Sequence, residues 1–421
     1  MRTWSVALAG AAILAVLPAV ALAGWSEPAR VTRADDGRFS DPAAAVGGTG
    51  EAVVAWVREP PTATGGSGRV FVATARRSGA WSAPRPLSGV GASGPRVAVG
   101  ARGDAIVVWS RGRAIAAAVR RGPGGRWVPG PVVMAGTAVR DIVVSMDATG
   151  RATILWTERR GSRFAVSVAT RATRTARSAW SVRPAHLSVP GPAAPSVALS
   201  PSHGALAAWV ERGRVRAART TDGRFEEPME LSEEASGTPG VALSPAGAAL
   251  AAWSSRLPGG TSVMLSADRG ARDGGWEDAE DVGVGAEPAV ALNDAGDAVV
   301  AWDVGEPGAS QGIEAVTRRR GGAWRSSTVV RRRSCSCAVD IGRAEIGAQG
   351  DAIVSWSRDG GPRGGGAGVI AAGGGAWGVA PDSRAAAGDA PAVAMGPEGT
   401  GLAVWAEQGR GAAVRATLRR R

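Results

Sequence analysis

The sequence predicts an all-β fold, an eight-bladed β-propeller of four-stranded antiparallel blades. Three observations support this prediction. A hairpin pattern that ends on Trp recurs eight times, a shorter pattern that begins on an aromatic residue follows it, and the last copy lacks its final piece, which stands at the start of the chain. Repeats of about 40–50 residues with several short strands are typical of propellers, in which each repeat forms one blade.

The first pattern is a hairpin of two apolar strands. Residues 288–302 read PAVALNDAGDAVVAW, and residues 391–405 read PAVAMGPEGTGLAVW. Apolar residues alternate, a turn rich in Gly and Pro reverses the chain, and the second strand ends on Trp. The copies start near residues 42, 95, 142, 195, 239, 288, 342 and 391 and end on Trp56, Trp109, Trp156, Trp209, Trp253, Trp302, Trp356 and Trp405.

The second pattern is a short strand that an aromatic residue opens. Trp81 opens WSAPRPLS, Phe225 opens FEEPMELS, and Trp127, Trp180, Trp276, Trp324 and Trp377 occupy the same place. The eighth copy ends at Arg421 before this strand, whereas Trp25 opens a matching WSEPARVT near the other end. Residues 391–421 and 24–41 together make a repeat of 49 residues, within the 44 to 54 of the other repeats. The N-terminal strand is therefore predicted to complete the eighth blade and close the ring.

The Trp residues are predicted to be structural. Of the 16 Trp residues, all but Trp4 fall on the two pattern positions. Because an aromatic side chain buries a large apolar area, we expect each to pack between neighbouring sheets rather than to form an exposed platform for sugars.

The first 23 residues are predicted to be a cleavable signal peptide. Arg2 precedes an apolar run from Val6 to Leu17, and Ala21-Leu22-Ala23 forms an A-x-A exit. The run is too short to span a bilayer, which takes about 20 apolar residues. Residues 24–421 are then a single propeller domain. We expect a secreted protein, extracellular or at the cell envelope, with no integral membrane span and in monomeric form.

Composition favours anionic partners. All 49 basic residues are Arg against 37 acidic residues, for a net charge of +12. A charge of this size attracts polyanions, although GC-rich coding explains the same bias. The two cysteines, Cys335 and Cys337, are candidates for a local disulfide and are too few for a metal site.

In architecture the repeats resemble those of bacterial exported propellers, such as the sialidase-like and NHL-like groups. The resemblance implies the fold and no activity. The Asp-box motif S-x-D-x-G-x-T-W does not occur, and the chain has no Tyr to serve as a sialidase nucleophile. Residues 308–312 match G-x-S-x-G around Ser310, but about one match is expected by chance and a nucleophile elbow needs a strand-to-helix turn. No metal or cofactor motif is present, so no cofactor is expected, and Asp294 to Asp297 is interpreted as a solvated turn.

Two faces of the ring differ in their predicted chemistry. In a four-stranded meander the turns between strands one and two, and between three and four, share one face, the turn face. The loops between strands two and three and the links between blades share the opposite face, the loop face. Glu345 replaces an Ala or Ser of the other copies and is expected to face the channel or to pair with an Arg. The ligand-binding candidates on the loop face, around the channel mouth, are Asp41, Arg58, Arg111, Asp141, Glu158, Glu211, Glu287, Glu345, Arg358 and Glu407.

Arginine recurs in the turn between the third and fourth strands. These guanidinium groups are predicted to form a basic crown that grips phosphate or carboxylate groups. The candidates for polyanion binding are Arg76, Arg77, Arg120, Arg121, Arg318, Arg319 and Arg320.

The sequence favours a non-enzymatic binding module or scaffold over an enzyme. The expected partner is an anionic polymer, a glycan or a protein of the envelope or the extracellular space, and export makes nucleic acid an unfavoured target. The alternative is an extracellular glycan hydrolase or lyase that uses carboxylates at the channel mouth. No catalytic residue is assigned.

Overall fold

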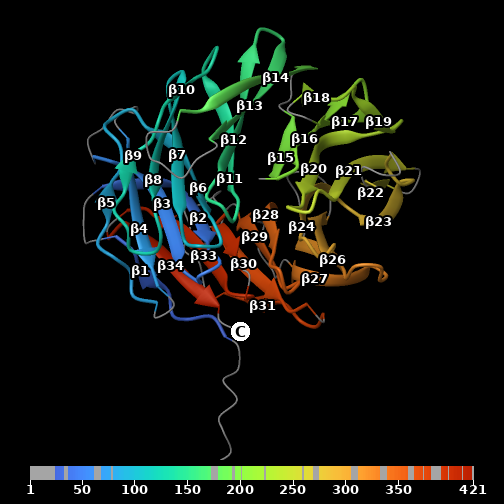
Figure 1. Cartoon of the computed structure of the whole chain (residues 1–421). Coiled ribbons are helices and arrows are strands. Elements are labelled where there is room, and N and C mark those ends of the chain that lie inside the picture. The colour runs from blue at the N-terminus through green and yellow to red at the C-terminus, as the bar shows by residue number, and fades with distance from the viewer. Residues whose placement is uncertain are drawn as a thin grey trace, which may run out of the picture.

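Eight antiparallel sheets form a ring around a central channel in a computed structural model of the chain (Figure 1). None of the described residues is helical, so the predicted all-β propeller with eight blades is confirmed. The structure describes residues 24–32, 37–60, 68–76, 79–171, 179–191, 195–200, 202–221, 224–257, 260–268, 275–304, 312–331, 339–358, 365–372, 374–380, 390–396, 398–409 and 411–419.

Each blade is a meander of consecutive strands. In the second and fourth blades the outer strand is split into two short pieces that pair with the same third strand. Blades 1 to 4 contain β2 (Arg38–Val46), β3 (Ala52–Glu59), β4 (Arg69–Ala75) and β5 (Arg85–Pro86); β6 (Ser93–Val99), β7 (Ala105–Arg111), β8 (Ala114–Arg120), β9 (Val128–Pro129) and β10 (Val133–Met134); β11 (Val139–Met146), β12 (Ala152–Arg160), β13 (Arg163–Arg171) and β14 (Ser181–Pro190); and β15 (Ser196–Ser200), β16 (Gly204–Glu211), β17 (Arg214–Thr221), β18 (Arg224–Phe225) and β19 (Met229–Ser232).

The remaining four blades follow the same order, and the eighth takes its outer strand from the start of the chain. Blades 5 to 8 contain β20 (Ser236–Leu243), β21 (Ala249–Leu257), β22 (Gly260–Ala267) and β23 (Glu280–Val284); β24 (Ala286–Leu292), β25 (Ala298–Val304), β26 (Gly312–Arg318) and β27 (Arg325–Arg331); β28 (Val339–Ile346), β29 (Ala352–Arg358), β30 (Gly365–Ile370) and β31 (Gly378–Val379); and β32 (Ala392–Met395), β33 (Gly401–Glu407), β34 (Ala413–Arg419) and β1 (Ala29–Arg30).

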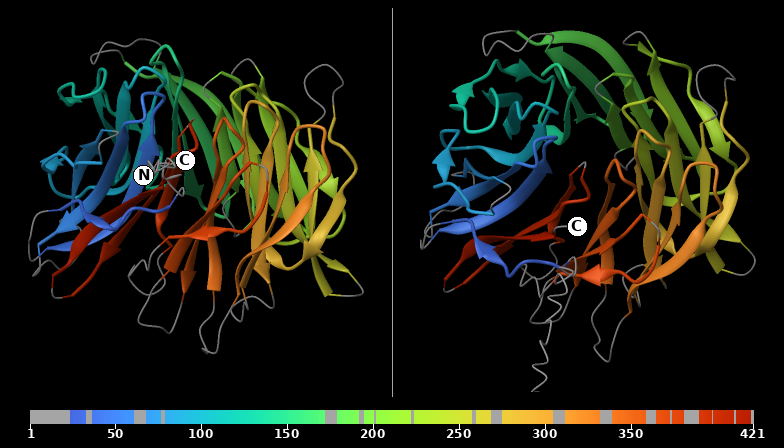
Figure 2. Two further views of the ribbon diagram at one scale, coloured as in Figure 1. Left: turned by 90° about the horizontal axis from the view of Figure 1, so that it is seen from below. Right: turned by 60° about the horizontal axis from the view of Figure 1, so that its bottom comes forward.

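The first strand of every blade lines the channel. Each first strand contacts the first strand of the next blade, from β2 through β6 and round to β32, which contacts β2 again. Figure 2 shows the ring from two further directions, with the blue N-terminal strands beside the red C-terminal blade. The residues of these first strands therefore decide what the channel presents.

The N-terminal strand closes the ring, as the sequence predicts. Strand β1 pairs with β34, with Ala29 opposite Ala416. The backbone N–H of Val31 donates to the carbonyl of Val414 at 2.8 Å. The indole Nε1 of Trp25 donates to the carbonyl of Gly378 in the seventh blade, also at 2.8 Å. Residues more than 350 positions apart thus hold the two ends of the chain together.

The hairpin Trp residues pack between blades, which confirms their predicted structural role. All eight are buried. Trp302 of the sixth blade shares a core cluster with Leu250 and Ala252 of the fifth blade. Small residues make room for the rings, because a Cβ added at Gly366 would lie 2.5 Å from the ring of Trp356. Burial of so large an apolar surface in each blade gap stabilises the ring.

A β-bulge recurs near the start of the first strand of a blade, at its loop-face end. In six blades the register between the first and second strands shifts just before or at the predicted start of the repeat, for example between Ser40 and Ala43 and between Ser93 and Arg96. Several of these bulges contain the recurring Pro, which lacks an N–H for the ladder. Bulges redirect side chains, and Asp41 and Asp141, which line a cavity of the channel, lie within two of them.

Candidate binding sites in the channel and on the turn face

A cavity of about 680 Å³ occupies the channel on the side of blades 7, 8, 1, 2 and 3. The first strands of these blades supply nearly all of its lining. Three of the ten predicted channel-mouth residues, Asp41, Asp141 and Glu345, line it together. The structure thus brings together carboxylates from the first, third and seventh blades.

Two arginines that the sequence analysis missed, Arg96 and Arg343, line the same cavity. Both stand 13 residues before the hairpin Trp of their own repeat, so they lie at one level of the channel. The other six repeats have Ala, Val, Ser or Gly at this position. The signal that singled out Glu345, a charged residue where other copies are small, was therefore present for both arginines as well.

The channel carboxylates are held by neighbouring donors. Asp141 accepts a hydrogen bond from the hydroxyl of Thr157 at 3.3 Å. Glu345 accepts one from the backbone N–H of Met395 at 3.1 Å, and its other oxygen lies 3.4 Å from Nε of Arg343. This arrangement agrees with the expectation that Glu345 faces the channel or pairs with an Arg.

The backbone of Asp41 is strained. Its φ is +51°, in the left-handed region that non-glycine residues seldom adopt, and its carboxylate accepts a hydrogen bond from the N–H of Gly94 at 3.4 Å. Glu287, at the equivalent position of the sixth blade, has a similar φ of +53° and does not line the cavity, so this conformation belongs to the bulge at the start of the first strand.

Burial and like charges set the electrostatics of the cavity. Burial lowers the pKa of Arg96, the nearby Arg343 lowers it further, and Asp141 and Asp41 oppose this shift. Burial also raises the pKa of Glu345, against the influence of Arg343 and the Met395 N–H. The cavity therefore holds charged groups that water solvates poorly.

The other seven predicted channel-mouth residues do not line this cavity, and several have partners of their own. Glu158 is buried, and the hydrogen bonds from Thr137 and Arg160 outweigh burial and lower its pKa. Glu211 forms an ion pair with Arg216, Glu407 forms one with Arg415, and Arg58 lies over the ring of Phe71. Arg111 and Glu287 are exposed to solvent, and Arg358 is the last residue of β29.

A buried acidic group of the sixth blade, next to the seventh blade that lines the cavity, has a raised pKa. Asp303, directly after Trp302, is buried and accepts a 2.6 Å hydrogen bond from the N–H of Ile341. Burial raises its pKa to about 8, and the charges of Asp340 and Glu287 add to this shift.

On the turn face, the described residues form two cavities between blades that are lined by arginines. The larger, of about 510 Å³ between blades 6 and 7, is lined by Arg318, Arg319 and Arg325. The smaller, of about 160 Å³ between blades 2 and 3, is lined by Arg120, Arg121, Arg126 and Arg171. Asp104 is the one carboxylate among the described residues that line either cavity. Four of the seven predicted crown residues thus lie in these two places.

Arg120 lies in a different environment from the one expected. It is the last residue of β8 rather than part of the turn, and its side chain is 1% exposed. It forms a bidentate ion pair with Glu51 of the first blade and also donates to the carbonyl of Gly103 at 3.1 Å. The Glu51 carboxylate therefore balances the charge of Arg120, and the ion pair joins the first blade to the second.

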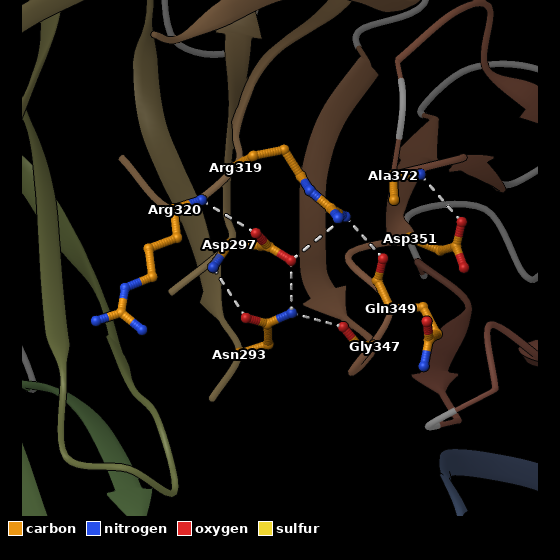
Figure 3. Close-up of polar contacts among 8 residues, drawn as sticks. All are labelled: Asn293, Asp297, Arg319, Arg320, Gly347, Gln349, Asp351 and Ala372. Atoms are coloured by element: carbon orange, nitrogen blue, oxygen red, sulfur yellow. Dashed lines mark hydrogen bonds and ion pairs between the residues drawn. The ribbon is translucent and has the colours of Figure 1, made fainter. Parts of the chain in front are cut away.

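The other described crown residues are exposed, except Arg318, which is half-buried. Arg319 is 59% exposed, Arg76 and Arg121 are exposed, and Arg318 stacks on the ring of Trp324 at 4.5 Å. The Arg320 side chain points away from the network around Asp297 (Figure 3).

Asp297 is not the solvated turn residue that the sequence suggested. It is 4% exposed. Its carboxylate accepts hydrogen bonds from the N–H of Arg320 at 3.1 Å and from the side chain of Asn293 at 3.1 Å (Figure 3). Asp104 and Asp351 likewise accept an N–H from the turn between the third and fourth strands of their own blades. In each of these blades the buried carboxylate links the turn between strands one and two to the turn between strands three and four.

Several predictions fall outside the described residues. These are the signal peptide, Arg77, the Cys335–Cys337 pair and Ser310. Among the residues that the structure describes, no group of three or more His, Cys, Asp or Glu side chains is arranged to hold a metal ion. No helix in the described part of the chain is long and apolar enough to cross a membrane.

The fold and its channel define the chain as an eight-bladed β-propeller with charged sites in the channel and on the turn face. A scan against protein-family models and a search of curated proteins both found no match. Among solved structures, the chain is similar to a protein of unknown function from Dyadobacter fermentans, with 13% identity, coverage of 94% of this chain and 99% of that one, and a TM-score of 0.41.

Two glycan-active proteins are also similar in structure. A polysaccharide lyase shares 9% identity over 75% of this chain and 87% of its own, with a TM-score of 0.44. A Hadza microbial sialidase shares 14% identity over 93% of this chain and 68% of its own, with a TM-score of 0.34. At these identities the likeness concerns the propeller fold alone.

Proposed function

We propose that the protein is an exported binding module whose turn face holds an anionic polymer of the envelope or the extracellular space. One observation carries this proposal: both turn-face cavities are lined by several arginines, and Arg319 of the larger one stays 59% exposed although it lies 3.5 Å from the buried carboxylate of Asp297. Guanidinium groups bind phosphate and carboxylate groups in bidentate fashion.

The exposure of these arginines supports the proposal. Arg121 and Arg126 at one cavity, and Arg319 and Arg325 at the other, are all exposed to solvent. The two cavities lie in non-adjacent blade gaps of the same face, so one extended polymer can contact both. Two weak contacts on one chain bind more tightly than either alone.

The test compares two variants with equal charge. The turn-face variant replaces Arg121, Arg126, Arg319 and Arg325 with Gln. The control replaces Arg113, Arg163, Arg212 and Arg256 with Gln, which are exposed residues in or beside the loops between second and third strands on the loop face. Binding to polyphosphate of defined length is measured at several salt concentrations.

The turn-face variant is expected to bind at least about tenfold more weakly. The slope of log affinity against log salt is expected to fall by about one for each phosphate group that the variant no longer neutralises. The control variant is expected to keep most of the affinity. Equal weakening in both variants would contradict the proposal, because it would mean that net charge alone attracts the polymer.

The channel favours a second candidate, a glycan hydrolase or lyase. Asp41, Asp141 and Glu345 share one cavity, and paired carboxylates in one pocket are the usual equipment for cleaving glycosidic bonds. Release of new sugar ends from acidic or neutral glycans, and its loss in Glu345→Gln and Asp141→Asn, would establish this function. Absence of release would leave the channel as a binding site.

A further inference from the structure

We propose that the channel cavity binds a sugar acid: the ligand's carboxylate lies between Arg96 and Arg343, and its hydroxyl groups donate to the acidic side chains around them. This site is distinct from the turn face and does not rest on the function proposed above. Its lining comes from five consecutive blades, and a ligand here lies within the ring rather than across it.

The two arginines favour the binding of an anion. They lie at the same level of one cavity, and the pKa of Arg96 is lowered by burial and by the positive charge of Arg343. Among the described residues, the guanidinium of Arg96 has one hydrogen-bond acceptor, the carbonyl of Pro95 at 3.0 Å. Asp41 and Asp141 offset the repulsion from a distance without an ion pair to Arg96. An anion between the two guanidinium groups relieves a repulsion that the protein itself leaves in place.

The flanking carboxylates limit the charge of that anion. Asp41 and Asp141 stand one level towards the loop face, two residues before the arginine level, and Glu345 stands two residues after it. A dianion such as a phosphate monoester would be repelled by these groups more than a monoanion. A carboxylate carries a single charge in a planar form that fits a guanidinium group. The acidic oxygens are hydrogen-bond acceptors, so they match the hydroxyl groups of a sugar.

Glu345 holds the guanidinium group of Arg343 in position for this role. The Glu345 carboxylate is itself fixed by the Met395 N–H, and it lies 3.4 Å from Nε of Arg343. That contact uses one edge of the guanidinium group, whose side chain is still 60% exposed in the channel. Glu345 is therefore a positioning residue for the anion site.

The size of the cavity agrees with one or two sugar rings. Ligand pockets commonly measure about 300–1,000 Å³, and this one measures about 680 Å³. Its walls between the charged groups are small apolar residues such as Ala44, Val97 and Val144. No Trp is among the described lining residues, so polar contacts rather than ring stacking must supply specificity.

The test is calorimetric titration of the mature protein with sodium D-glucuronate, D-glucose and D-glucose 6-phosphate at low salt. Glucuronate is expected to bind with a dissociation constant of about 1 mM or below, and the neutral and the phosphorylated sugar at least about tenfold more weakly. Arg96→Gln and Arg343→Gln are each expected to weaken glucuronate binding at least about tenfold. Arg256→Gln, a matched loss of charge on the loop face, is expected to leave it unchanged.

Absence of glucuronate binding would overturn the proposal, as would equal affinity for glucose or an unchanged affinity in Arg343→Gln. Arg343 is exposed, so its replacement is expected to leave the fold intact, and its result decides the matter if Arg96→Gln does not fold. Polyphosphate binding by Arg343→Gln, measured in parallel, shows whether the turn-face function is intact independently of the channel.

Discussion

The buried ion pair between Glu51 and Arg120 gives a prediction whose size follows from the structure. The Arg120 side chain is 1% exposed and that of Glu51 3%, and the pair joins the first blade to the second. Arg120→Met removes the cation, its hydrogen bond to Gly103 and its contact with the ring of Trp127, but leaves the Glu51 carboxylate buried without this partner. Removal of one member of such a pair costs about 3–5 kcal/mol, mostly because a buried charge remains.

Thermal unfolding measures this cost. A folded chain of this length has an unfolding entropy of about 0.8 kcal/mol/K, so a destabilisation of about 4 kcal/mol lowers the Tm by about 5 °C. The double variant Glu51→Leu, Arg120→Met is expected to recover most of that stability, because it buries no charge. Arg214→Gln, which breaks an exposed ion pair with Glu230, is the control and is expected to cost less than about 1 kcal/mol. A Tm unchanged in Arg120→Met would refute the reasoning and return Arg120 to the solvent-exposed crown.

Three further predictions concern stability. Burial raises the pKa of Asp303 from its ordinary 3.8 to about 8 in the folded state, so between these values the folded state keeps a proton that the unfolded state loses. The free energy of unfolding is therefore expected to fall as the pH rises from about 4 to about 8. Melting curves at several pH values should show a flatter slope for Asp303→Asn. Gly366→Ala places a Cβ 2.5 Å from the Trp356 ring and is expected to cost about 1–3 kcal/mol by denaturant titration, whereas Gly112→Ala, with open space around it but a φ of +61°, tests backbone strain alone. Deletion of residues 24–32 removes the strand paired with β34 and exposes that edge, and it is expected to lower the Tm and to promote aggregation in light scattering; an unaltered Tm would argue against closure by this strand.

The fold could be predicted from the repeat pattern because the interactions that form each blade are local. Alternation, turn glycines and a Trp at the end of each hairpin define the strands, and the split of one repeat between the two termini defines the closure by β1. The burial of Trp302 and its equivalents follows from the same pattern. These features depend on neighbours within one repeat or in the next.

The sites were harder to predict because they depend on which repeats face one another. The sequence singled out Glu345 but not Arg96 and Arg343, although the same comparison among repeats marks all three. It placed Arg120 in an exposed crown because nothing local reveals that Glu51, 69 residues earlier, reaches it from the neighbouring blade. The buried role of Asp297 was missed because one of its partners, the N–H of Arg320, lies 23 residues away in the other turn of the same blade.

The measurement that tests the central claim most directly is a crystal structure of the protein with a short oligophosphate, determined at low salt. Electron density for phosphate groups is expected in the two turn-face cavities, against Arg319 and Arg325 between blades 6 and 7 and against Arg121 and Arg126 between blades 2 and 3. Well-defined phosphate density on the loop face or in the channel, with both turn-face cavities empty, would contradict it.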